Sequence, residues 1–257
     1  MKIEPQLIGL YTITRRELTR MFRIAGQVFL PSVVTSLLYF LIFGDVIGKR
    51  MGLIQGVEYS TFITPGLIMM TAITNSYSNV CSSLYSVRFQ KSIEEILITP
   101  LKPQILLLGY TLGGVCRGLI VAVLVYIVAS FFVSLGSVNI FMSVLVIILV
   151  SAIFSLAGFA NAMVARSFDD VAIVPTFILT PLTYLGGVFY TVLMLPEFWQ
   201  KVIYINPIFY MINVLRHFML GIEEVNVTIA FISMIFLLAV MIFINLHMLK
   251  KGIGLRD

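Results

Sequence analysis

Long stretches without a charged residue constrain this chain more than any other feature. Five such runs cover residues 24–44, 59–87, 118–165, 171–196 and 225–249. The whole chain of 257 residues has only 17 Lys or Arg and 12 Asp or Glu. A chain with so few charges, gathered in clusters, cannot present a water-soluble surface. Because about 20 consecutive apolar residues cross a lipid bilayer as a helix, each run is long enough to span one.

The runs predict an all-α membrane protein with six transmembrane helices. The run over 118–165 is too long for one helix, and Ser134, Gly136 and Ser137 interrupt it with residues typical of turns. Its first half extends back through Arg117 to Gln104. We therefore expect spans at about 24–44, 62–84, 104–133, 140–164, 173–195 and 227–249.

The distribution of positive charge predicts the orientation. Six spans place both termini on one side of the membrane, and that side carries twelve of the 17 Lys and Arg residues, against four on the other side. Lys and Arg are enriched in cytoplasmic loops, so both termini are expected in the cytoplasm. The net charge of +5 is then explained by orientation and by contact with anionic lipid, and no nucleic-acid partner is expected.

Two segments outside the spans are predicted to be amphipathic helices. Residues 1–23 place Leu7, Tyr11, Leu18 and Met21 at helical spacing in a segment rich in Arg, which is typical of an interfacial helix on the cytoplasmic leaflet. Such a helix commonly serves only as a topology anchor, and this interpretation stays open.

The second amphipathic segment, residues 88–103, has apolar and charged faces. Phe89 and Ile93 lie on the apolar face, Glu94 and Glu95 lie elsewhere, and Pro100 ends the helix. An anionic leaflet would repel the two glutamates, so a protein partner is favoured over a helix resting on lipid.

Residues 197–224, on the other side, are too interrupted to span. Asn206 and Pro207 divide them, and the aromatic residues there are typical of a membrane interface. We expect two short re-entrant helices before the last span.

Polar groups inside the predicted spans mark the candidate interior sites. Arg117 is charged and lies within a span, where it has to face protein or water, either as a packed residue or as part of a pathway. The second span is the most polar, with Asn75 and Asn79 among many hydroxyls, and is expected to line a dimer interface or a translocation path. Small residues beside Arg117 form two Gly-xxx-Gly pairs that favour close helix packing, Gly109 with Gly113 and Gly114 with Gly118.

The segment from Leu179 to Arg216 resembles the signature of the ABC-2 family of membrane permeases. It runs Leu-Thr-Pro-Leu-Thr-Tyr-Leu-Gly-Gly-Val-Phe-Tyr, then Leu-Pro, then Pro-Ile-Phe-Tyr, and ends at the arginine. The resemblance implies one ABC-2 domain over 1–257 in a bacterial cytoplasmic membrane. It also implies a homodimer that pairs with two copies of a separate ABC ATPase subunit.

The same resemblance assigns roles to particular residues. It implies that the 88–103 helix couples to the ATPase, through Arg88, Phe89, Lys91, Ile93, Glu94, Glu95 and Leu97. It implies an external gate that includes Gly186, Gly187, Pro196, Pro207, Tyr210 and Arg216. It further implies that the helix over 1–23 lines the cytoplasmic entrance of the path.

Sequence motifs for catalysis are missing. Gly48 and Lys49 are followed by Arg50, with no P-loop spacing, so ATP hydrolysis is expected on a partner, and no cofactor or metal is expected. A secondary transporter driven by an ion gradient is the main alternative, but it needs membrane carboxylates, and only Asp169 and Asp170 at a loop edge come near. A non-transporting scaffold would not need a polar second span. The scarcity of membrane charge favours an amphipathic or lipid-linked cargo.

Overall fold

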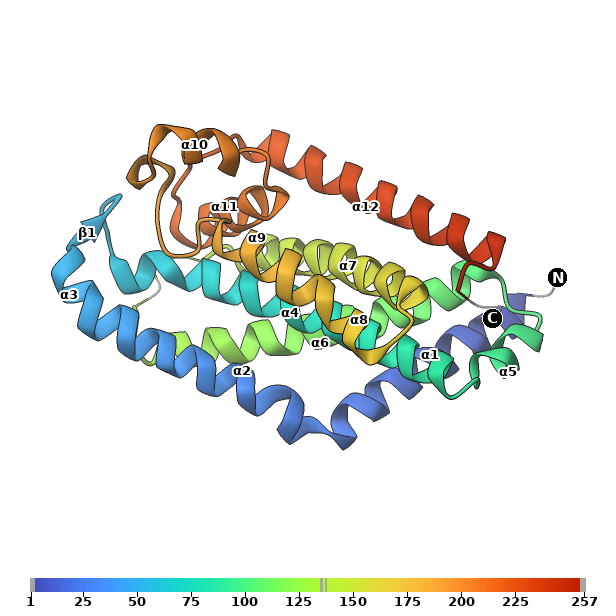
Figure 1. Ribbon diagram of the computed structural model, residues 1–257. Helices are drawn as coiled ribbons and strands as arrows, with labels where there is room; N and C mark the ends of the chain where they lie inside the picture. Colours follow the sequence, from blue (N-terminus) through green and yellow to red (C-terminus); the bar gives the residue numbers. More distant parts are fainter. Residues whose placement is uncertain (1–2, 135, 137, 255–257) are drawn as a thin grey trace.

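A computed structural model describes residues 3–134, 136 and 138–254, and most of them are helical. The helices form an elongated bundle (Figure 1). Helix α1 (Ile3–Arg23) begins and helix α12 (Val227–Lys251) ends at the same end of the molecule, which we call the termini end. At the opposite end, the hairpin end, strands β1 (Leu53–Ile54) and β2 (Val57–Glu58) form a small antiparallel hairpin, the one departure from helix and loop among the described residues.

Helix α4 (Tyr59–Phe89) lies at the centre of the bundle. It packs along its length against α6 (Pro103–Ser130) and α7 (Ile140–Val164), and near the hairpin end against α11 (Pro207–Leu220). Helices α2 (Ala25–Tyr39) and α12 lie on the outside and expose most of their apolar side chains. The buried residues of α4 include many hydroxyls and amides, so the most polar long helix is also the one most enclosed by protein.

Four helices of the described chain are long and apolar enough to cross a membrane. They cover Ala25–Gly44, Pro103–Ser130, Ile140–Val164 and Val227–Lys251, close to four of the six predicted spans. The first of them runs from α2 into the π-helical segment η1 (Phe40–Ile47), which leads into the short helix α3 (Gly48–Met51). Helix α4 has 31 residues and contains the predicted 62–84 span, but its polar groups keep it out of this apolar set.

The predicted span at 173–195 differs from the structure. The helical part is built from α8 (Phe168–Val174), the π-helical turn η2 (Pro175–Leu179) and α9 (Thr180–Tyr184), and it ends before Gly186 and Gly187. Pro175 lacks an N–H, and its carbonyl accepts the backbone N–H of Thr180 five residues on, which widens the turn. The prolines and glycines therefore break the segment that was predicted as one continuous span.

Residues 185–226 form a compact cap at the hairpin end. A turn leads to the 3₁₀ helix η3 (Val192–Met194), to α10 (Glu197–Ile203), and then to α11. Asn206 lies between α10 and α11, and its side-chain oxygen accepts the backbone N–H of Ile208, so it caps α11 while Pro207 occupies the first helical position. Two short helices, α10 and α11, thus lie on either side of Asn206, where the sequence predicted a division, and their re-entrant position in a membrane stays a prediction.

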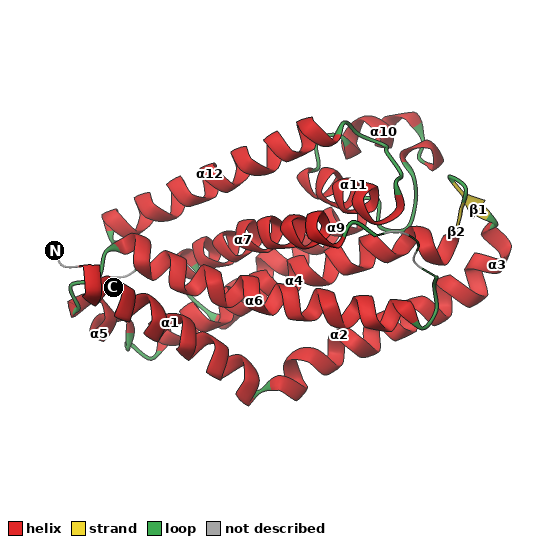
Figure 2. Cartoon of the chain, turned by 180° about the vertical axis from the view of Figure 1, so that it is seen from behind, coloured by secondary structure: helices red, strands yellow, loops and turns green. Residues whose placement is uncertain are grey.

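Helix α1 packs against the first half of α6 and meets α2 at a sharp bend (Figure 2). The expected amphipathic helix is present, with Leu7, Tyr11 and Phe22 exposed, but its inner face buries Ile13 and the charged Glu17. Gly109 and Gly113 make this approach possible. A Cβ atom on Gly109 would lie 2.6 Å from Ile13, and one on Gly113 would lie 2.6 Å from Glu17.

The second Gly-xxx-Gly pair faces the other side of α6. A Cβ atom on Gly114 would lie 2.1 Å from the Ser155 hydroxyl oxygen, and one on Gly118 would lie 2.4 Å from the Ser151 hydroxyl oxygen, both on α7. The two predicted glycine pairs therefore hold α6 between α1 and α7.

Helices α4 and α7 approach each other closely at Gly158, and this packing can be tested there. A Cβ atom there would lie 2.4 Å from the carbonyl oxygen of Tyr77. Gly158→Ala is expected to destabilise the fold by about 1–3 kcal/mol, because backbone has to shift. Gly26→Ala is the control, since nothing lies within 4 Å of that position. Thermal denaturation in detergent should show a lower midpoint for Gly158→Ala alone, and equal midpoints for both variants would contradict this packing.

Candidate functional site

Buried charge gathers at two places in the bundle. One is the junction of α1, α4 and α6, which we call the polar cluster. It consists of Arg16, Glu17, Arg20, Asn75, Asn79, Ser83, Tyr110 and Arg117. The other is at the hairpin end, around Arg216. Because an uncompensated buried charge is costly, the partners of each group show what the arrangement can do.

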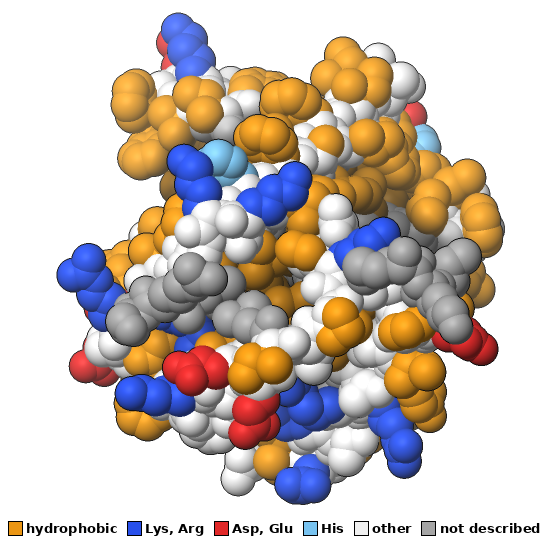
Figure 3. Space-filling model, turned by 90° about the vertical axis from the view of Figure 1, so that its right-hand side faces the viewer, with side chains coloured by type: hydrophobic (Ala, Val, Ile, Leu, Met, Phe, Trp, Pro, Cys, Tyr) orange, Lys and Arg blue, Asp and Glu red, His pale blue; other side chains and the backbone are white. Residues whose placement is uncertain are grey.

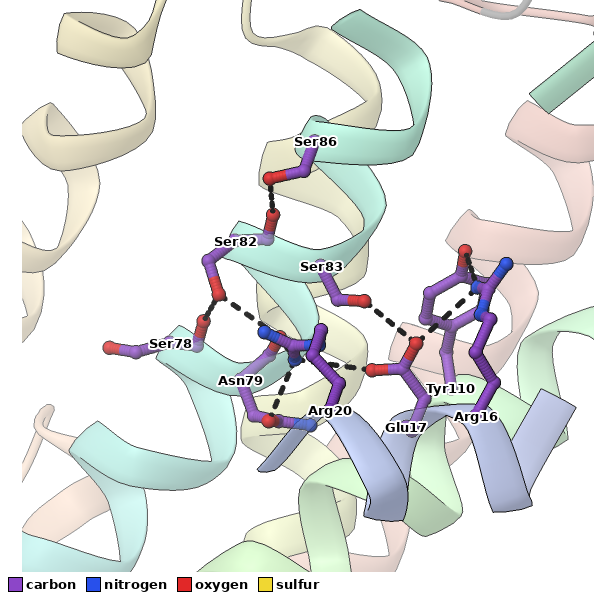
Figure 4. Close-up of polar contacts among 9 residues, drawn as sticks. All are labelled: Arg16, Glu17, Arg20, Ser78, Asn79, Ser82, Ser83, Ser86 and Tyr110. Carbon is purple, nitrogen blue, oxygen red and sulfur yellow. Dashed lines mark hydrogen bonds and ion pairs between the residues drawn. The ribbon is translucent and has the colours of Figure 1, made fainter. Parts of the chain in front are cut away.

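Glu17 is the centre of the polar cluster (Figure 4). Its side chain is fully enclosed, and Oε1 accepts from Ser83 Oγ at 2.7 Å and from Arg16 Nη2 at 3.3 Å. Oε2 accepts from Arg20 Nη2 at 3.2 Å. Arg16 also donates to the Tyr110 hydroxyl at 2.6 Å. These bonds tie α1 to both α4 and α6.

Two asparagines of α4 each accept hydrogen bonds from an arginine. Arg20 Nη2 donates at 2.9 Å to both the side-chain and the backbone oxygen of Asn79. Arg117 donates to the side-chain oxygen of Asn75 through Nε at 3.2 Å and Nη2 at 3.1 Å. Asn75 in turn donates to Ser32 of α2 at 3.1 Å. Arg117 is therefore held by an amide oxygen, and among the described residues it has no carboxylate partner.

A stripe of hydroxyls runs along the open face of α4 beside the polar cluster. It consists of Thr71, Thr74, Ser78, Ser82 and Ser86, which are partly or fully exposed while the residues between them are mostly buried. Four of these hydroxyls donate to carbonyls of the preceding turn. Asn75 and Asn79 are themselves buried, so this hydroxyl stripe, rather than the asparagines, is the surface that α4 offers outside the chain.

The termini end carries the segment that was expected to couple to a partner. Arg88 and Phe89 belong to the end of α4, and helix α5 (Ile93–Ile98) follows after a turn in which Lys91 has φ +58. Ile93 is buried, whereas Phe89, Lys91, Glu94 and Glu95 are exposed. The side chain of Leu97 lies outside the described part of the structure.

Arg88 and Phe89 anchor this segment in different ways. Arg88 turns into the bundle and donates to the carbonyls of Ala162 and Ala165, so it satisfies the end of α7. Phe89 lies beside Phe168 of α8, with ring centroids 5.0 Å apart. The exposed surface of the segment is therefore Phe89, Lys91, Glu94 and Glu95, and Arg88 supports it from within.

A hollow of about 710 Å³ lies next to this surface, between the ends of α4 and α7 and the start of the C-terminal turn. Figure 3 views this end of the molecule and shows Lys, Arg, Asp and Glu side chains gathered around it. At the start of α8, Asp170 accepts the backbone N–H groups of Arg166 and Ser167, and these hydrogen bonds, the one from Arg166 above all, lower the pKa of its carboxyl group.

Arg216 is completely buried at the hairpin end. It is one of the four Lys and Arg residues that the sequence analysis counted on the outer side of the membrane. Its Nη2 donates to the carbonyl oxygen of Gly187 at 2.7 Å, and its Nη1 donates to Asn213 at 3.1 Å. The guanidinium also lies 3.9 Å from the centroid of the Phe62 ring on α4. This arginine therefore joins the turn at Gly187, helix α11 and the central helix.

A carboxylate completes the surroundings of Arg216. Glu224 Oε2 lies 3.8 Å from Arg216 Nη1, and Glu224 Oε1 accepts from Gln55 of the β hairpin at 2.8 Å. Burial raises the pKa of Glu224, while the charge of Arg216 and the bond from Gln55 act in the opposite direction.

The other residues expected at an external gate build the same cap. Gly187 has φ +79, which favours glycine, and the neighbouring Gly186 packs against Ile208 of α11. Pro196 precedes α10, Pro207 begins α11, and Tyr210 donates to the carbonyl oxygen of Tyr204 at 2.9 Å. The structure thus brings Gly186, Gly187 and Arg216 together, while Pro196, Pro207 and Tyr210 shape the two short helices.

Sequence reasoning missed the residues that compensate the buried arginines. Glu17, Ser83, Tyr110 and Glu224 were not predicted as site residues. A signal existed for Glu17, since it is an acid among four arginines and lies three residues before Arg20, at the spacing of an ion pair on a helix. Ser83 and Tyr110 had no comparable local signal.

Comparison with known proteins agrees with the signature. Residues 9–220 match the model of the ABC-2 type transporter family. The chain is 44% identical over 250 residues to the inner membrane transport permease YadH of Escherichia coli K12, which covers 97% of this chain and 98% of that protein.

More distant relatives carry a different name. Nodulation protein J of Rhizobium meliloti is 25% identical over 216 residues, covering 84% of this chain and 82% of that protein. Nodulation protein J of Neorhizobium galegae is 23% identical over 254 residues, covering 95% and 94%. The family model matches most of this chain, and the relative from Escherichia coli matches it almost end to end. This chain therefore belongs to the ABC-2 type transporter family of membrane permeases.

Proposed function

We propose that this chain is the permease subunit of an ATP-binding cassette exporter in a bacterial cytoplasmic membrane. Two copies would form the pathway, and each would bind one copy of a separate ATPase subunit. The observation that carries the proposal is the exposed surface at the termini end, which we call the knob. It consists of Phe89, Lys91, Glu94 and Glu95, at the end of the central helix α4 and the start of α5. Membership of the family and the name of the relative from Escherichia coli, an inner membrane transport permease, support it.

Six crossings are consistent with this architecture. The four apolar helices would supply four of them, and α4 would supply another, since its polar groups are largely enclosed by α6, α7 and α11. The segment from α8 to α9 would be the remaining one. The cap at 185–226 would then lie at the outer leaflet, with both termini in the cytoplasm, as the charge distribution predicts.

The fold offers a mechanical link from the knob to the pathway. Helix α4 is continuous from the knob to the hairpin end, and Arg88 connects it to the end of α7. A push on α5 by the ATPase would therefore move α4 and α7 together, and with them the hydroxyl stripe. Between two copies of the chain, the stripe would provide a polar path, and the cap held by Arg216 would close it on the outside.

The alternative of an ion-driven secondary transporter needs a carboxylate that is free to bind a cation inside the membrane. The structure does contain a buried carboxylate, Glu17, which the sequence argument had not considered. It is already paired with Arg16 and Arg20, so it compensates protein charge and is not available to an ion. We therefore favour the ATP-driven permease.

Charge reversal at the knob tests the coupling role. Glu94→Lys with Glu95→Lys should weaken binding of the ATPase subunit and abolish export, because both side chains are exposed on the proposed docking surface. Folding should be unaffected, since exposed charges contribute about 0–1 kcal/mol. Glu197→Lys, an exposed glutamate on α10, is the matched control and should bind normally. Co-purification with the ATPase subunit measures the effect, and normal binding by the doubly reversed protein would reduce α5 to a surface helix.

Orientation can be tested independently by cysteine labelling. With Cys81 and Cys116 replaced by Ala, cysteines at Lys49 or Lys201 should react with a membrane-impermeant maleimide in sealed cells, and those at Lys91 or Lys251 should not. Permeabilised cells should label all four positions. Labelling of position 91 from outside would overturn the orientation, and the coupling role would go with it.

A further inference from the structure

The polar cluster contains more positive than negative charge. Arg16 and Arg20 contact a single carboxylate, Glu17, and Arg117, whose partner Asn75 lies one helical turn from the Asn79 that holds Arg20, contacts no carboxylate among the described residues. The other partners of the arginines are neutral: Asn75, Asn79 and the Tyr110 hydroxyl. If all four groups are ionised, two positive charges are left over in a place where uncompensated charge is costly.

Unused hydrogen-bond donors accompany this charge. Arg20 uses Nη2 for its bonds, and Arg117 uses Nε and Nη2, so Nη1 of each guanidinium has no partner in the described part of the chain. Nε of Arg20 and Nδ2 of Asn79 also lack acceptors. The cluster therefore lacks acceptors and negative charge, and both deficits point to an anion.

Arg20 and Arg117 lie beside successive turns of α4. Asn75 and Asn79, which hold them, lie one helical turn apart on the same face. Each arginine is reachable: the Arg20 side chain is 31% exposed, and Arg117 is half-buried. In Figure 4, Arg20 lies between the buried Glu17 and the serines of the hydroxyl stripe, so a ligand moving along the stripe would meet it directly.

The depth of the cluster suits a lipid headgroup. The uncharged run of the first span begins at residue 24, and Arg20 lies just before it. Arg117 lies in the middle of α6, and it is bonded to Asn75, which donates to Ser32 of α2. Under the proposed orientation, Arg20 therefore lies near the cytoplasmic headgroup level, and Arg117 lies about one helical turn deeper along α4.

We propose that Arg20 and Arg117 bind the phosphate group of an anionic amphiphile at the cytoplasmic leaflet, next to the hydroxyl stripe. A phosphate monoester carries close to two negative charges and several acceptor oxygens, which matches two guanidiniums with free donors. The inference rests on the proposed function for its orientation, and it adds a class of cargo or lipid ligand to it.

The test compares two lipids that differ only in the phosphate. The purified full-length chain is titrated with dioleoyl phosphatidic acid or with dioleoylglycerol, and bound lipid is counted by native mass spectrometry. Wild type should prefer phosphatidic acid by about tenfold or more. Arg20→Gln and Arg117→Gln should each remove most of that preference, whereas Arg117→Lys, which keeps the charge, should lie between wild type and Arg117→Gln.

Arg23→Gln is the matched control, because Arg23 is an exposed cation on the same helix and lies outside the cluster. It should keep the preference. Equal binding of the two lipids by wild type, or an equal loss in Arg23→Gln and Arg20→Gln, would overturn the proposal in favour of general attraction to a basic helix. Melting midpoints separate loss of binding from loss of fold: if Arg20→Gln unfolds, the comparison of Arg117→Gln with Arg117→Lys decides.

A competition arm identifies the source of the phosphate. Millimolar inorganic phosphate that displaces phosphatidic acid would assign the site to a soluble phosphorylated ligand, and no displacement would assign it to lipid phosphate. Both results support a phosphate site. The assay contains no ATPase, so a negative lipid-binding result would leave the proposed coupling role intact. Failure of the ATPase to bind the knob would likewise leave the lipid-binding result intact.

Discussion

Polar groups inside a bilayer have to be satisfied by protein, and the arrangement of this chain follows from that constraint. Its polar side chains are concentrated on α4, and the other helices are packed around this helix. Close packing needs small residues, which Gly113 provides against α1 and Gly158 against α4. One face of α4 is left open, and it carries hydroxyls that bond to their own helix and so tolerate either water or a ligand.

Arginines are held in the same manner in the polar cluster and at the hairpin end. Arg117 is bonded to Asn75, Arg20 to Asn79, and Arg216 to Asn213. An amide oxygen fixes the orientation of a guanidinium without cancelling its charge. At the hairpin end, Glu224 supplies the missing negative charge within the chain. In the polar cluster the single carboxylate leaves an excess, and this contrast makes the cluster a candidate for binding an anion while the Arg216 site is a structural tie.

Much of the fold could be predicted from the sequence, because a helix that crosses a lipid bilayer needs a run of consecutive apolar residues. The bounds of α7 match the prediction, those of α12 differ by two residues, and the break at Asn206 lies where expected. The segment after Tyr184 was predicted poorly, because hydropathy does not distinguish a spanning helix from an apolar cap packed on protein. Arg88 was assigned to a coupling surface because it lies in a charged, amphipathic segment, where helical spacing predicts exposure, and Glu17 was not considered. Their actual partners, Ala162 and Ser83, are far away in sequence, and only tertiary packing brings them together.

Under the proposed function, this chain provides the path and a separate subunit provides the energy. ATP hydrolysis by the purified permease, measured in lipid vesicles with and without the ATPase subunit, tests it most directly. The absence of a P-loop predicts no hydrolysis by the permease alone, and activity only when the subunit is added. Hydrolysis that persists in a preparation shown to be free of any partner would contradict the account.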